Sequence, residues 1–335
     1  MKQFEIPEFG IDRLQLAEVE APQPGPGQVL VRMTAASLNF RDLRVVEGKY
    51  NPRLKRPMRP LSDGVGVIEE VGSGVERWTK GDRVAGIFMQ KWIDGQITRE
   101  KWNSALGGAV QGVLGEYVLF SEDGVVSVPP SLSDEEAACL PCAAVTAWHA
   151  LFECAPAVPG QTVLIQGTGG VSVFALQFAK AAGLRTIVTS SSDEKLERVR
   201  SMGAAETVNY KTSPAWDEAA RKLTDGIGVD NVVEVGGSDT LPKSLKSVRM
   251  GGLISVIGLL SGVEPSVAPT SILMNSIRVQ GIYVGSRWMF ERMNHAIAFH
   301  NIKPVIDQVF PWTDFPEALR YMEKQRHFGK ICLRF

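Results

Sequence analysis

The residues best suited to chemistry in this chain of 335 residues form a glycine-rich turn. Gly167, Gly169 and Gly170 follow the apolar run TVLIQ and precede a helix-length stretch, VSVFALQFAKAAG. The first glycine permits a tight strand-to-helix turn, and the second lets the backbone approach a pyrophosphate. The helix start, at Val171, supplies free N–H groups to the anion, and Ser172 replaces the usual third glycine. The pattern predicts a dinucleotide site, although such glycines alone could form a purely structural turn.

The end of the next apolar run bears on the choice of dinucleotide. An acidic residue there would bind the adenosine ribose diol and select NAD, but the residue is Ser190. Ser190, Ser191 and Lys195 could instead accept a 2′-phosphate. The same segment, SSSDEK, also has the pattern of a helix N-cap. We predict that the cofactor is NADP(H) rather than NAD(H).

The elements that must position this turn alternate regularly along the chain. Short apolar runs at 162–167, 185–190, 206–210, 231–236 and 253–258 are separated by helix-length segments, and SIRVQGIYVG follows them. This alternation predicts a parallel sheet with helices on both faces. The predicted fold class is therefore α/β, with a doubly wound Rossmann domain at 125–285.

The remaining residues predict a β-rich domain at 1–124 that is completed by 286–335. Short strands there are punctuated by glycine and proline, and a long helix followed by a closing strand, KICLRF, ends the chain. The stretch 89–115, which contains Trp92 and Trp102, keeps no clean apolar period. We expect it to pass over a cleft rather than to belong to the core.

Composition excludes several classes of protein. Lys and Arg number 36 against 37 Asp and Glu, so no excess charge draws the chain to nucleic acid or an anionic membrane. No apolar run approaches the ~18 residues of a membrane span, and the N-terminus lacks the apolar core of a signal peptide. Four cysteines are too few for a disulfide framework in a chain this long, which favours the reducing cytoplasm.

Several motifs, taken in order, resemble the medium-chain dehydrogenase/reductase superfamily, which includes zinc alcohol dehydrogenases and zinc-free quinone oxidoreductases. These motifs are SLNFRDL, SDGVGVIEEVGSGVERWTKGDRV, LPCAAVTAWHAL, the glycine turn, MGAAETVNY and FGKICLRF. The resemblance covers essentially the whole chain. It implies a GroES-like catalytic domain, an active site in the interdomain cleft and a nicotinamide near Thr146. The further cofactor-binding residues predicted on this basis are Tyr210, Gly236, Gly258, Leu259, Val284 and Lys330.

The chain departs from the zinc members of this superfamily at the metal site. Zinc members have Cys, His and Cys at the places of Asn39, Asp63 and Cys142, so only Cys142 is kept. One thiolate and one carboxylate without imidazole make a poor zinc site. Arg41 replaces the hydroxyl residue of the proton relay, and 89–115 lacks the cysteines of the structural zinc lobe. We predict that no metal is bound.

Two neighbouring features admit a functional and a structural interpretation. Cys139 and Cys142 form a C-x-x-C pair, but no second pair of ligands lies nearby in the sequence, which favours a core position over redox or metal chemistry. His149 follows Thr146 by three residues. We expect it to be a packed or interfacial histidine rather than a catalytic base.

Without zinc, the protein must orient the cofactor and polarise the substrate oxygen by other means. The predicted catalytic residues are Asn39, Tyr50 and Thr146. Asn39 offers a neutral amide donor in the zinc-ligand position. Tyr50 could donate a hydrogen bond or proton, or could serve only as a lid residue. Asp42 is expected to orient its loop through backbone hydrogen bonds.

These residues predict a zinc-independent, NADP(H)-dependent oxidoreductase acting on a small carbonyl, quinone or enone. One alternative is an NAD(P)-dependent alcohol dehydrogenase that recruits a metal through Cys142 and Asp63. Another is a non-catalytic cofactor-binding protein of crystallin-like or accessory type. The β-prone run SIRVQGIYVG would end the sheet, and such an uncovered edge predicts a homodimer.

Overall fold

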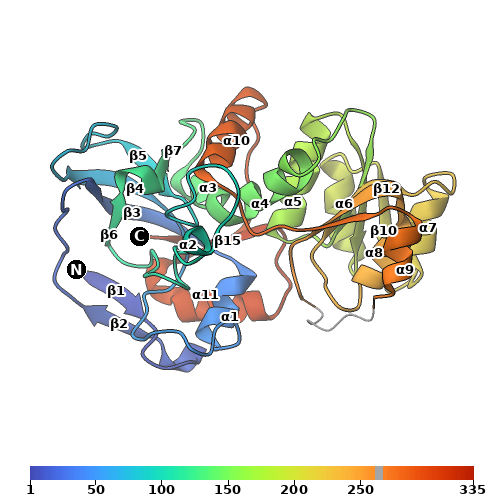
Figure 1. Ribbon diagram of the computed structural model, residues 1–335. Coiled ribbons are helices and arrows are strands. Elements are labelled where there is room, and N and C mark those ends of the chain that lie inside the picture. Colours follow the sequence, from blue (N-terminus) through green and yellow to red (C-terminus); the bar gives the residue numbers. More distant parts are fainter. Residues whose placement is uncertain (261–266) are drawn as a thin grey trace. The chain divides into compact units, whose positions relative to one another are not determined.

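A computed structural model describes residues 1–260 and 267–335. The chain divides into two compact units, one formed by Met1–Val145 with Val284–Phe335 and the other by Thr146–Tyr283. Strands dominate the first unit, whereas strands and helices alternate in the second (Figure 1). No helix in the described ranges is long and apolar enough to cross a membrane.

The second unit is the predicted Rossmann domain. Its six-stranded sheet has the order β10-β9-β8-β11-β12-β13, and every pair of neighbours is parallel. The strands are β8 (Thr162–Gln166), β9 (Arg185–Ser190), β10 (Glu206–Asn209), β11 (Val229–Glu234), β12 (Val248–Val256) and β13 (Arg278–Gly281). The helices are α5 (Gly170–Ala181), α6 (Asp193–Ser201), α7 (Trp216–Lys222), α8 (Leu241–Ser247) and α9 (Pro269–Met274).

The apolar runs of the sequence form this sheet because its central strands are covered on both faces. Leu164, Ile187, Val232 and Ile254 are completely buried in one core cluster. The strand order reverses between β8 and β11, and ligands bind at the carboxyl ends of such strands. The last predicted strand is shorter than expected, because β13 ends at Gly281, opposite Val256, where its partner β12 also ends. Further along, Val284 has a left-handed φ of 56°, so an extended strand cannot reach Gly285.

The first unit is built on a seven-stranded sheet of order β14-β15-β3-β4-β5-β7, with β6 also paired to β3. Its strands are β3 (Gln28–Leu38), β4 (Asp63–Val71), β5 (Arg83–Gly86), β6 (Tyr117–Ser121), β7 (Val125–Ser127), β14 (Ile306–Pro311) and β15 (Lys330–Arg334), and β1 (Lys2–Glu5) pairs with β2 (Gln15–Glu18). The helices are α1 (Phe40–Val46), α2 (Arg99–Trp102), α3 (Asp134–Ala138), α10 (Arg287–Phe299) and α11 (Phe315–Glu323). After α3 the chain continues through a π-helical turn (Leu140–Ala144), α4 (Val145–Trp148) and a second π-helical turn (His149–Glu153).

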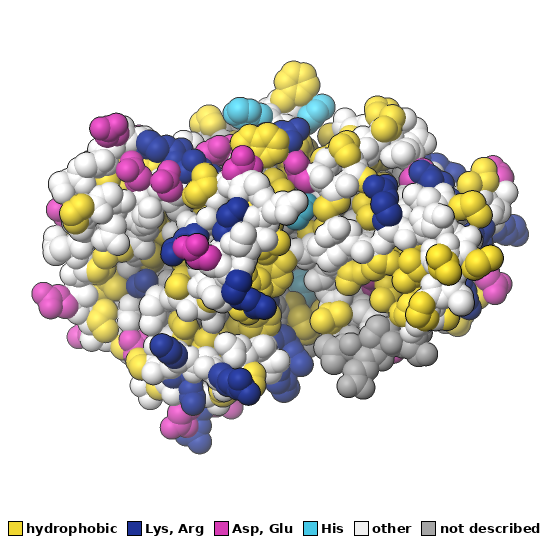
Figure 2. Space-filling model, viewed as in Figure 1, with side chains coloured by type: hydrophobic (Ala, Val, Ile, Leu, Met, Phe, Trp, Pro, Cys, Tyr) yellow, Lys and Arg dark blue, Asp and Glu magenta, His cyan; other side chains and the backbone are white. Residues whose placement is uncertain are grey.

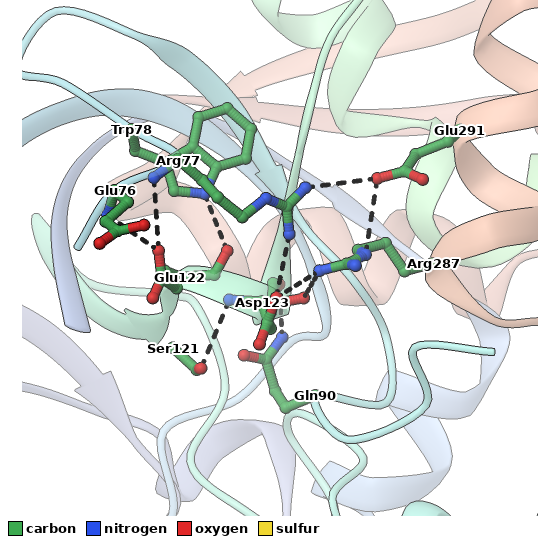
Figure 3. Close-up of polar contacts among 10 residues, drawn as sticks. Glu76, Arg77, Trp78, Gln90, Ser121, Glu122, Asp123, Arg287 and Glu291 are labelled. Carbon is green, nitrogen blue, oxygen red and sulfur yellow. Dashed lines mark hydrogen bonds and ion pairs between the residues drawn. The ribbon is translucent and has the colours of Figure 1, made fainter. Parts of the chain in front are cut away.

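The C-terminal segment is an integral part of this β-rich unit. Strand β15 lies antiparallel to β3, with Ile331 opposite Leu38. Helix α10 is held by a ring of ion pairs, in which Asp123 lies 3.0 Å from Arg77 and 2.7 Å from Arg287 (Figure 3). Glu291 closes the ring at 3.7 Å and 3.5 Å from the same two guanidinium groups. Because these side chains are partly exposed, the ring adds little to the free energy of unfolding and mainly orients α10.

The structure differs from two expectations about this unit. The predicted change of domain falls at residue 124, whereas the compact unit extends to Val145. The reason is that β7 pairs with β5 and α3 packs against β3 and β4. The stretch 89–115 was also expected to lie outside the core, and this was wrong in part. Trp92 is buried, and Leu106, Val113 and Leu114 belong to the core cluster of the unit.

Candidate active site

The glycine turn joins β8 to α5 with the geometry that a dinucleotide site requires. Gly167 has a left-handed φ of 73°, and α5 begins at Gly170. A Cβ atom built on Gly169 would meet no described atom within 4 Å, so open space adjoins the backbone where α5 begins. The Ser172 hydroxyl donates a 2.6 Å hydrogen bond to the carbonyl of Gln166, which keeps the helix close to the strand. Val171 lies in the first turn of this helix.

A buried carboxylate organises the adjacent strand end. Glu234 ends β11, is completely buried and accepts five hydrogen bonds. All of these donors are neutral, and four of them come from residues 236–244, so the carboxylate fixes the loop that follows β11. The five donors are the N–H groups of Gly236 (2.8 Å) and Gly237 (3.0 Å), Nε2 of Gln166 (2.7 Å), and the hydroxyls of Thr240 and Ser244 (both 2.5 Å).

The residues predicted to discriminate between NADP(H) and NAD(H) lie at the carboxyl end of β9 and directly after it. Ser190 is buried, and its hydroxyl accepts a hydrogen bond from the Ser192 N–H at 3.3 Å. Ser192 in turn caps α6 by accepting from the Lys195 N–H at 3.3 Å, which confirms the N-cap interpretation of this segment. The N–H of Tyr210 donates to the Ser190 carbonyl at 3.0 Å, and its side chain is exposed. Ser191, which follows Ser190, is half-buried.

The other predicted cofactor residues of this unit lie on loops after β11 and β12. Gly258 approaches another backbone so closely that a Cβ atom there would lie 2.5 Å from the Val235 carbonyl oxygen. Gly236 is similarly confined by the Thr240 side chain, whereas Leu259 is exposed. Thr146 is buried at the start of the same unit.

In the β-rich unit, a buried ammonium group contacts the predicted polarising amide. Lys330 is 3% exposed, and its Nζ donates to Oδ1 of Asn39 and to the Leu38 carbonyl, both at 2.6 Å. Nδ2 of Asn39 is buried and has no hydrogen-bond partner among the described residues. The amide therefore has a fixed acceptor end and an unused donor end. The buried Val284, also predicted to border the cofactor, belongs to this unit too.

Asp63 lies in the same cluster, and both of its oxygens are occupied. Oδ1 accepts from the Ser62 hydroxyl at 2.7 Å, and Oδ2 accepts from the Cys142 backbone N–H at 3.0 Å. That N–H belongs to the π-helical turn after α3 and is among the donors that a helix start leaves unpaired. Burial raises the pKa of Asp63, and the Lys330 charge opposes the rise. The Asn39 side chain also lowers the pKa of Asp63, although Nδ2 of Asn39 forms no hydrogen bond with the described residues.

Asp42 orients the loop before α1, as predicted. Its Oδ2 accepts from the backbone N–H of Asn39 at 2.8 Å, and its own N–H donates to the Asn39 carbonyl at 2.9 Å. Oδ1 accepts no hydrogen bond from the described residues, and Nη1 of Arg41 lies 3.6 Å away. Burial raises the pKa of Asp42 from its ordinary 3.8 to about 6, against the opposing effect of Arg41.

Tyr50 is placed beside this cluster by Arg41. The guanidinium carbon of Arg41 lies 5.2 Å from the centre of the Tyr50 ring and 4.6 Å from that of Phe88. Such distances permit cation–π attraction to both rings. Tyr50 is exposed and Phe88 buried, so Arg41 links the surface tyrosine to the interior.

The cysteines of the C-x-x-C pair have different surroundings. Cys139 is buried with its Sγ 3.4 Å from that of Cys332, and burial raises the pKa of its thiol. Burial and the neighbouring Asp63 also raise the pKa of the half-buried Cys142. Across the described ranges, no three His, Cys, Asp or Glu residues are grouped so as to hold a metal ion.

Comparison with known proteins gives matches over nearly the whole chain. The family "Alcohol dehydrogenase GroES-like domain" matches residues 25–130, and "Zinc-binding dehydrogenase" matches residues 170–300. A zinc-type alcohol dehydrogenase-like protein of Schizosaccharomyces pombe, C1773.06c, is 46% identical over 97% of this chain and 96% of its own. The chain belongs to the medium-chain dehydrogenase/reductase superfamily. It is a zinc-type alcohol dehydrogenase-like member and hence an NAD(P)-dependent oxidoreductase.

Solved structures agree with this membership of the dehydrogenase/reductase superfamily. A candidate alcohol dehydrogenase from Sinorhizobium meliloti 1021 has a TM-score of 0.94 at 41% identity, covering 100% of this chain and 98% of its own. An NAD-dependent alcohol dehydrogenase has a TM-score of 0.91 at 34% identity, covering 100% of both chains. The predicted family, the α/β fold class with a GroES-like domain and the oxidoreductase assignment are confirmed.

Sequence reasoning missed two parts of the site. The role of Glu234 was not foreseen, although an acid at the end of an apolar strand, followed by two glycines, is a signal that could have drawn attention to it. Lys330 was predicted only as a cofactor residue. Its contact with Asn39 joins residues 291 positions apart and depends on the pairing of β15 with β3.

Proposed function

We propose that this dehydrogenase/reductase uses NADP(H) without a catalytic zinc and reduces, or forms, a small carbonyl, quinone or enone compound. The observation that carries the zinc-free assignment is the engagement of the three residues at the zinc-ligand positions. Asn39 Oδ1 faces an ammonium group, both oxygens of Asp63 accept hydrogen bonds, and the described residues bring no further His, Cys, Asp or Glu to form a metal-binding group with Cys142. A zinc ion needs unprotonated ligands with free lone pairs. This donor set does not fit it.

The residues of each unit have distinct roles in the proposed reaction. When bound, the dinucleotide supplies or accepts the hydride. The backbone at Gly169 and the first turn of α5 would hold its pyrophosphate, and Glu234 fixes the loop after the neighbouring strand β11. Asn39 donates from Nδ2 to the substrate oxygen as negative charge develops there. Tyr50 is proposed as a second, peripheral donor, and Thr146 as a neighbour of the nicotinamide.

The preference for NADP(H) is proposed from the residue at the end of β9. Ser190 carries no negative charge, so a 2′-phosphate meets no repulsion from it, and Ser191 and Lys195 follow it in the sequence, Lys195 five positions on. NAD(H) is the competing cofactor, as in the NAD-dependent relative described above. The test is a fluorescence titration of wild type and Ser190→Asp. We expect NADPH to bind more tightly than NADH in wild type and the preference to fall at least about tenfold in Ser190→Asp. Equal affinities in wild type would refute the assignment.

We also propose a homodimer formed through the free edge of the Rossmann sheet. Strand β13 is exposed along its whole length, and apolar side chains gather over the neighbouring α9 (Figure 2). Leu273 and Met274 of α9 are 75% and 73% exposed, an unusual cost for a monomer. Sedimentation velocity at micromolar concentration should show a dimer, and Gln280→Pro should shift it toward monomer. The cytoplasm remains the proposed compartment, in keeping with four free cysteines.

The experiment for the central assignment combines turnover with metal analysis. Oxidation of NADPH is followed with a quinone, an enone and an aldehyde, before and after incubation with a chelator, and zinc is measured in the same sample. We expect turnover of at least one compound, no stoichiometric zinc and no loss on chelation. One zinc per chain, lost together with activity, would favour the metal-dependent alcohol dehydrogenase. NADPH binding without turnover of any compound would favour a non-catalytic protein.

A further inference from the structure

The lysine that begins β15 is an unusual feature of the β-rich unit. Lys330 is almost completely buried, and an ammonium group is rarely found inside a protein unless it is paired. It follows Gly329, whose left-handed φ is 79° and whose close approach to the Val305 carbonyl excludes a Cβ atom. The backbone before Lys330 is therefore tightly constrained. The side chain is directed inward by this entry into the strand, toward the start of α1.

The position of Lys330 in the sheet determines which residues it reaches. Strand β15 is antiparallel to β3, with Ile331 opposite Leu38, so Lys330 lies beside the point where β3 ends and α1 begins. Its Nζ contacts Leu38 and Asn39 at that junction, both at 2.6 Å. Asn39 is the N-cap residue of α1 and faces the first turn of this helix in a capping-box arrangement with Asp42, while its side-chain oxygen accepts from Lys330. The amide oxygen is thus the end that meets both the ammonium group and the start of the helix.

Lys330 lies among groups of the opposite charge. Its field lowers the pKa values of both Asp42 and Asp63, which burial raises. Arg41 is the second cation of the cluster, 3.6 Å from Asp42. Two buried carboxyl groups thus lie close to two cationic side chains, and the four form one polar cluster.

The charge of Lys330 decides which end of the Asn39 amide is available. An ammonium group has three donors and no acceptor, so only the amide oxygen can face it. A rotated amide would bring –NH2 against –NH3⁺. We propose that Lys330 is a positioning residue for the reaction: it locks the Asn39 amide with its oxygen inward, so that Nδ2 is presented to the substrate oxygen. This inference rests on the proposed function, in which Asn39 is the polarising donor.

Two other roles of Lys330 are compatible with the same contacts to Leu38 and Asn39. Lys330 could bind the cofactor, as the family resemblance implies, in which case its removal weakens NADPH binding. Alternatively, the amide could only bridge Lys330 and Asp63 within the folded unit, since its side chain also lowers the pKa of Asp63. In that case removal of either residue lowers stability and leaves kcat unchanged.

A double-mutant cycle between Lys330 and Asn39 separates these roles. Lys330→Met, Asn39→Ala and the double variant are compared with wild type by kcat, KM and NADPH Kd, using the quinone, enone or aldehyde that wild type turns over fastest. Lys330→Arg keeps the charge and the donors. Lys80→Met is the control, because Lys80 forms an exposed ion pair with Glu69 in the same unit. Circular dichroism and urea unfolding establish that each variant is folded.

We expect Lys330→Met to lower kcat by about 100-fold, as a misplaced catalytic group does, with NADPH Kd within about threefold of wild type. In the Asn39→Ala background, Lys330→Met should lower kcat by less than about threefold, because Lys330 acts through the Asn39 side chain. Lys330→Arg should recover part of the rate, and Lys80→Met should match wild type. If Lys330→Met does not fold, the cycle is run with Lys330→Arg, where non-additive losses in kcat are again expected.

Three outcomes would overturn the inference. These are multiplicative losses in the double variant, a weakening of NADPH binding as large as the loss in kcat, and an unchanged kcat in a folded Lys330 variant. The proposed function fails separately, if wild type turns over none of the compounds or if Asn39→Ala keeps full kcat. A large loss in Asn39→Ala without one in Lys330→Met would leave the proposed function standing and remove only the role of Lys330.

Discussion

The two units bury carboxylates in opposite ways. In the Rossmann unit, Glu234 accepts five neutral hydrogen bonds, and within the described ranges it forms no ion pair. In the β-rich unit, Asp42 and Asp63 are accompanied by Arg41 and Lys330, and their pKa values are raised. Both oxygens of Glu234 accept hydrogen bonds. By contrast, Oδ1 of Asp42 accepts no hydrogen bond, and Nδ2 of Asn39 donates none, among the described residues.

This difference separates a fully hydrogen-bonded cluster from one that has unused buried polar atoms. A fully satisfied buried network makes a loop rigid and specifies one conformation. A cluster with an unused buried donor carries a cost in the folded protein, which a bound ligand can remove. Glu234 therefore holds the loop after β11, whereas we propose that the Asn39 cluster contacts the substrate.

The largest expected effect concerns the satisfied cluster. Glu234→Gln places an –NH2 group among donors, so the hydrogen bonds of one carboxylate oxygen are lost and their partners remain buried. We expect the free energy of unfolding to fall by about 4 kcal/mol. Urea unfolding followed by tryptophan fluorescence measures this change.

Glu218→Gln is the matched control, because Glu218 is exposed on α7 of the same unit. Its effect should stay within about 0.5 kcal/mol. If Glu234→Gln changes the free energy of unfolding as little as Glu218→Gln does, then other contacts hold the loop after β11. The contrast between the two clusters would then be lost.

A smaller effect is expected from Asp42 and depends on pH. Its folded-state pKa of about 6 exceeds the ordinary 3.8, so the folded state holds this proton more tightly than the unfolded state does. Ionisation of Asp42 therefore lowers stability as pH rises from about 4 to about 6, by up to about 3 kcal/mol. Asp42→Asn removes this cost.

The measurement is the difference in unfolding free energy between Asp42→Asn and wild type at several pH values. We expect Asp42→Asn to gain on wild type as pH rises from about 4 to 7, since contributions from other groups cancel in the difference. A constant difference across this range would show that Asp42 titrates alike in the folded and unfolded states.

The sequence could predict the features that depend on local pattern. The Rossmann strands were recognised because β-branched runs such as RTIVTS are buried on both faces, and the turn at Gly167 because its spacing is specific. The length of β13 could not be predicted, because β13 ends where its partner β12 ends, and no pattern in its own residues marks that point. Burial of Trp92 was missed because the stretch 89–115 packs without a regular period.

The polar site was predicted less completely, for a related reason. Asn39 and Asp63 were identified by comparison with zinc enzymes, residue by residue. What engages them was not visible, because Lys330 and the Cys142 backbone reach them only through sheet pairing and a π-helical turn. Such contacts depend on tertiary register, which no local pattern in the sequence encodes.

The central claim is that the Asn39 amide takes over the polarisation of the substrate oxygen. Its most direct test is kcat at saturating NADPH for Asn39→Ala, with the NADPH Kd measured on the same sample. The exposed Asn103→Ala serves as the control. We predict that kcat falls by about 100-fold or more, while the NADPH Kd stays near the wild-type value. An Asn39→Ala enzyme that is folded, binds NADPH and retains full kcat would contradict it.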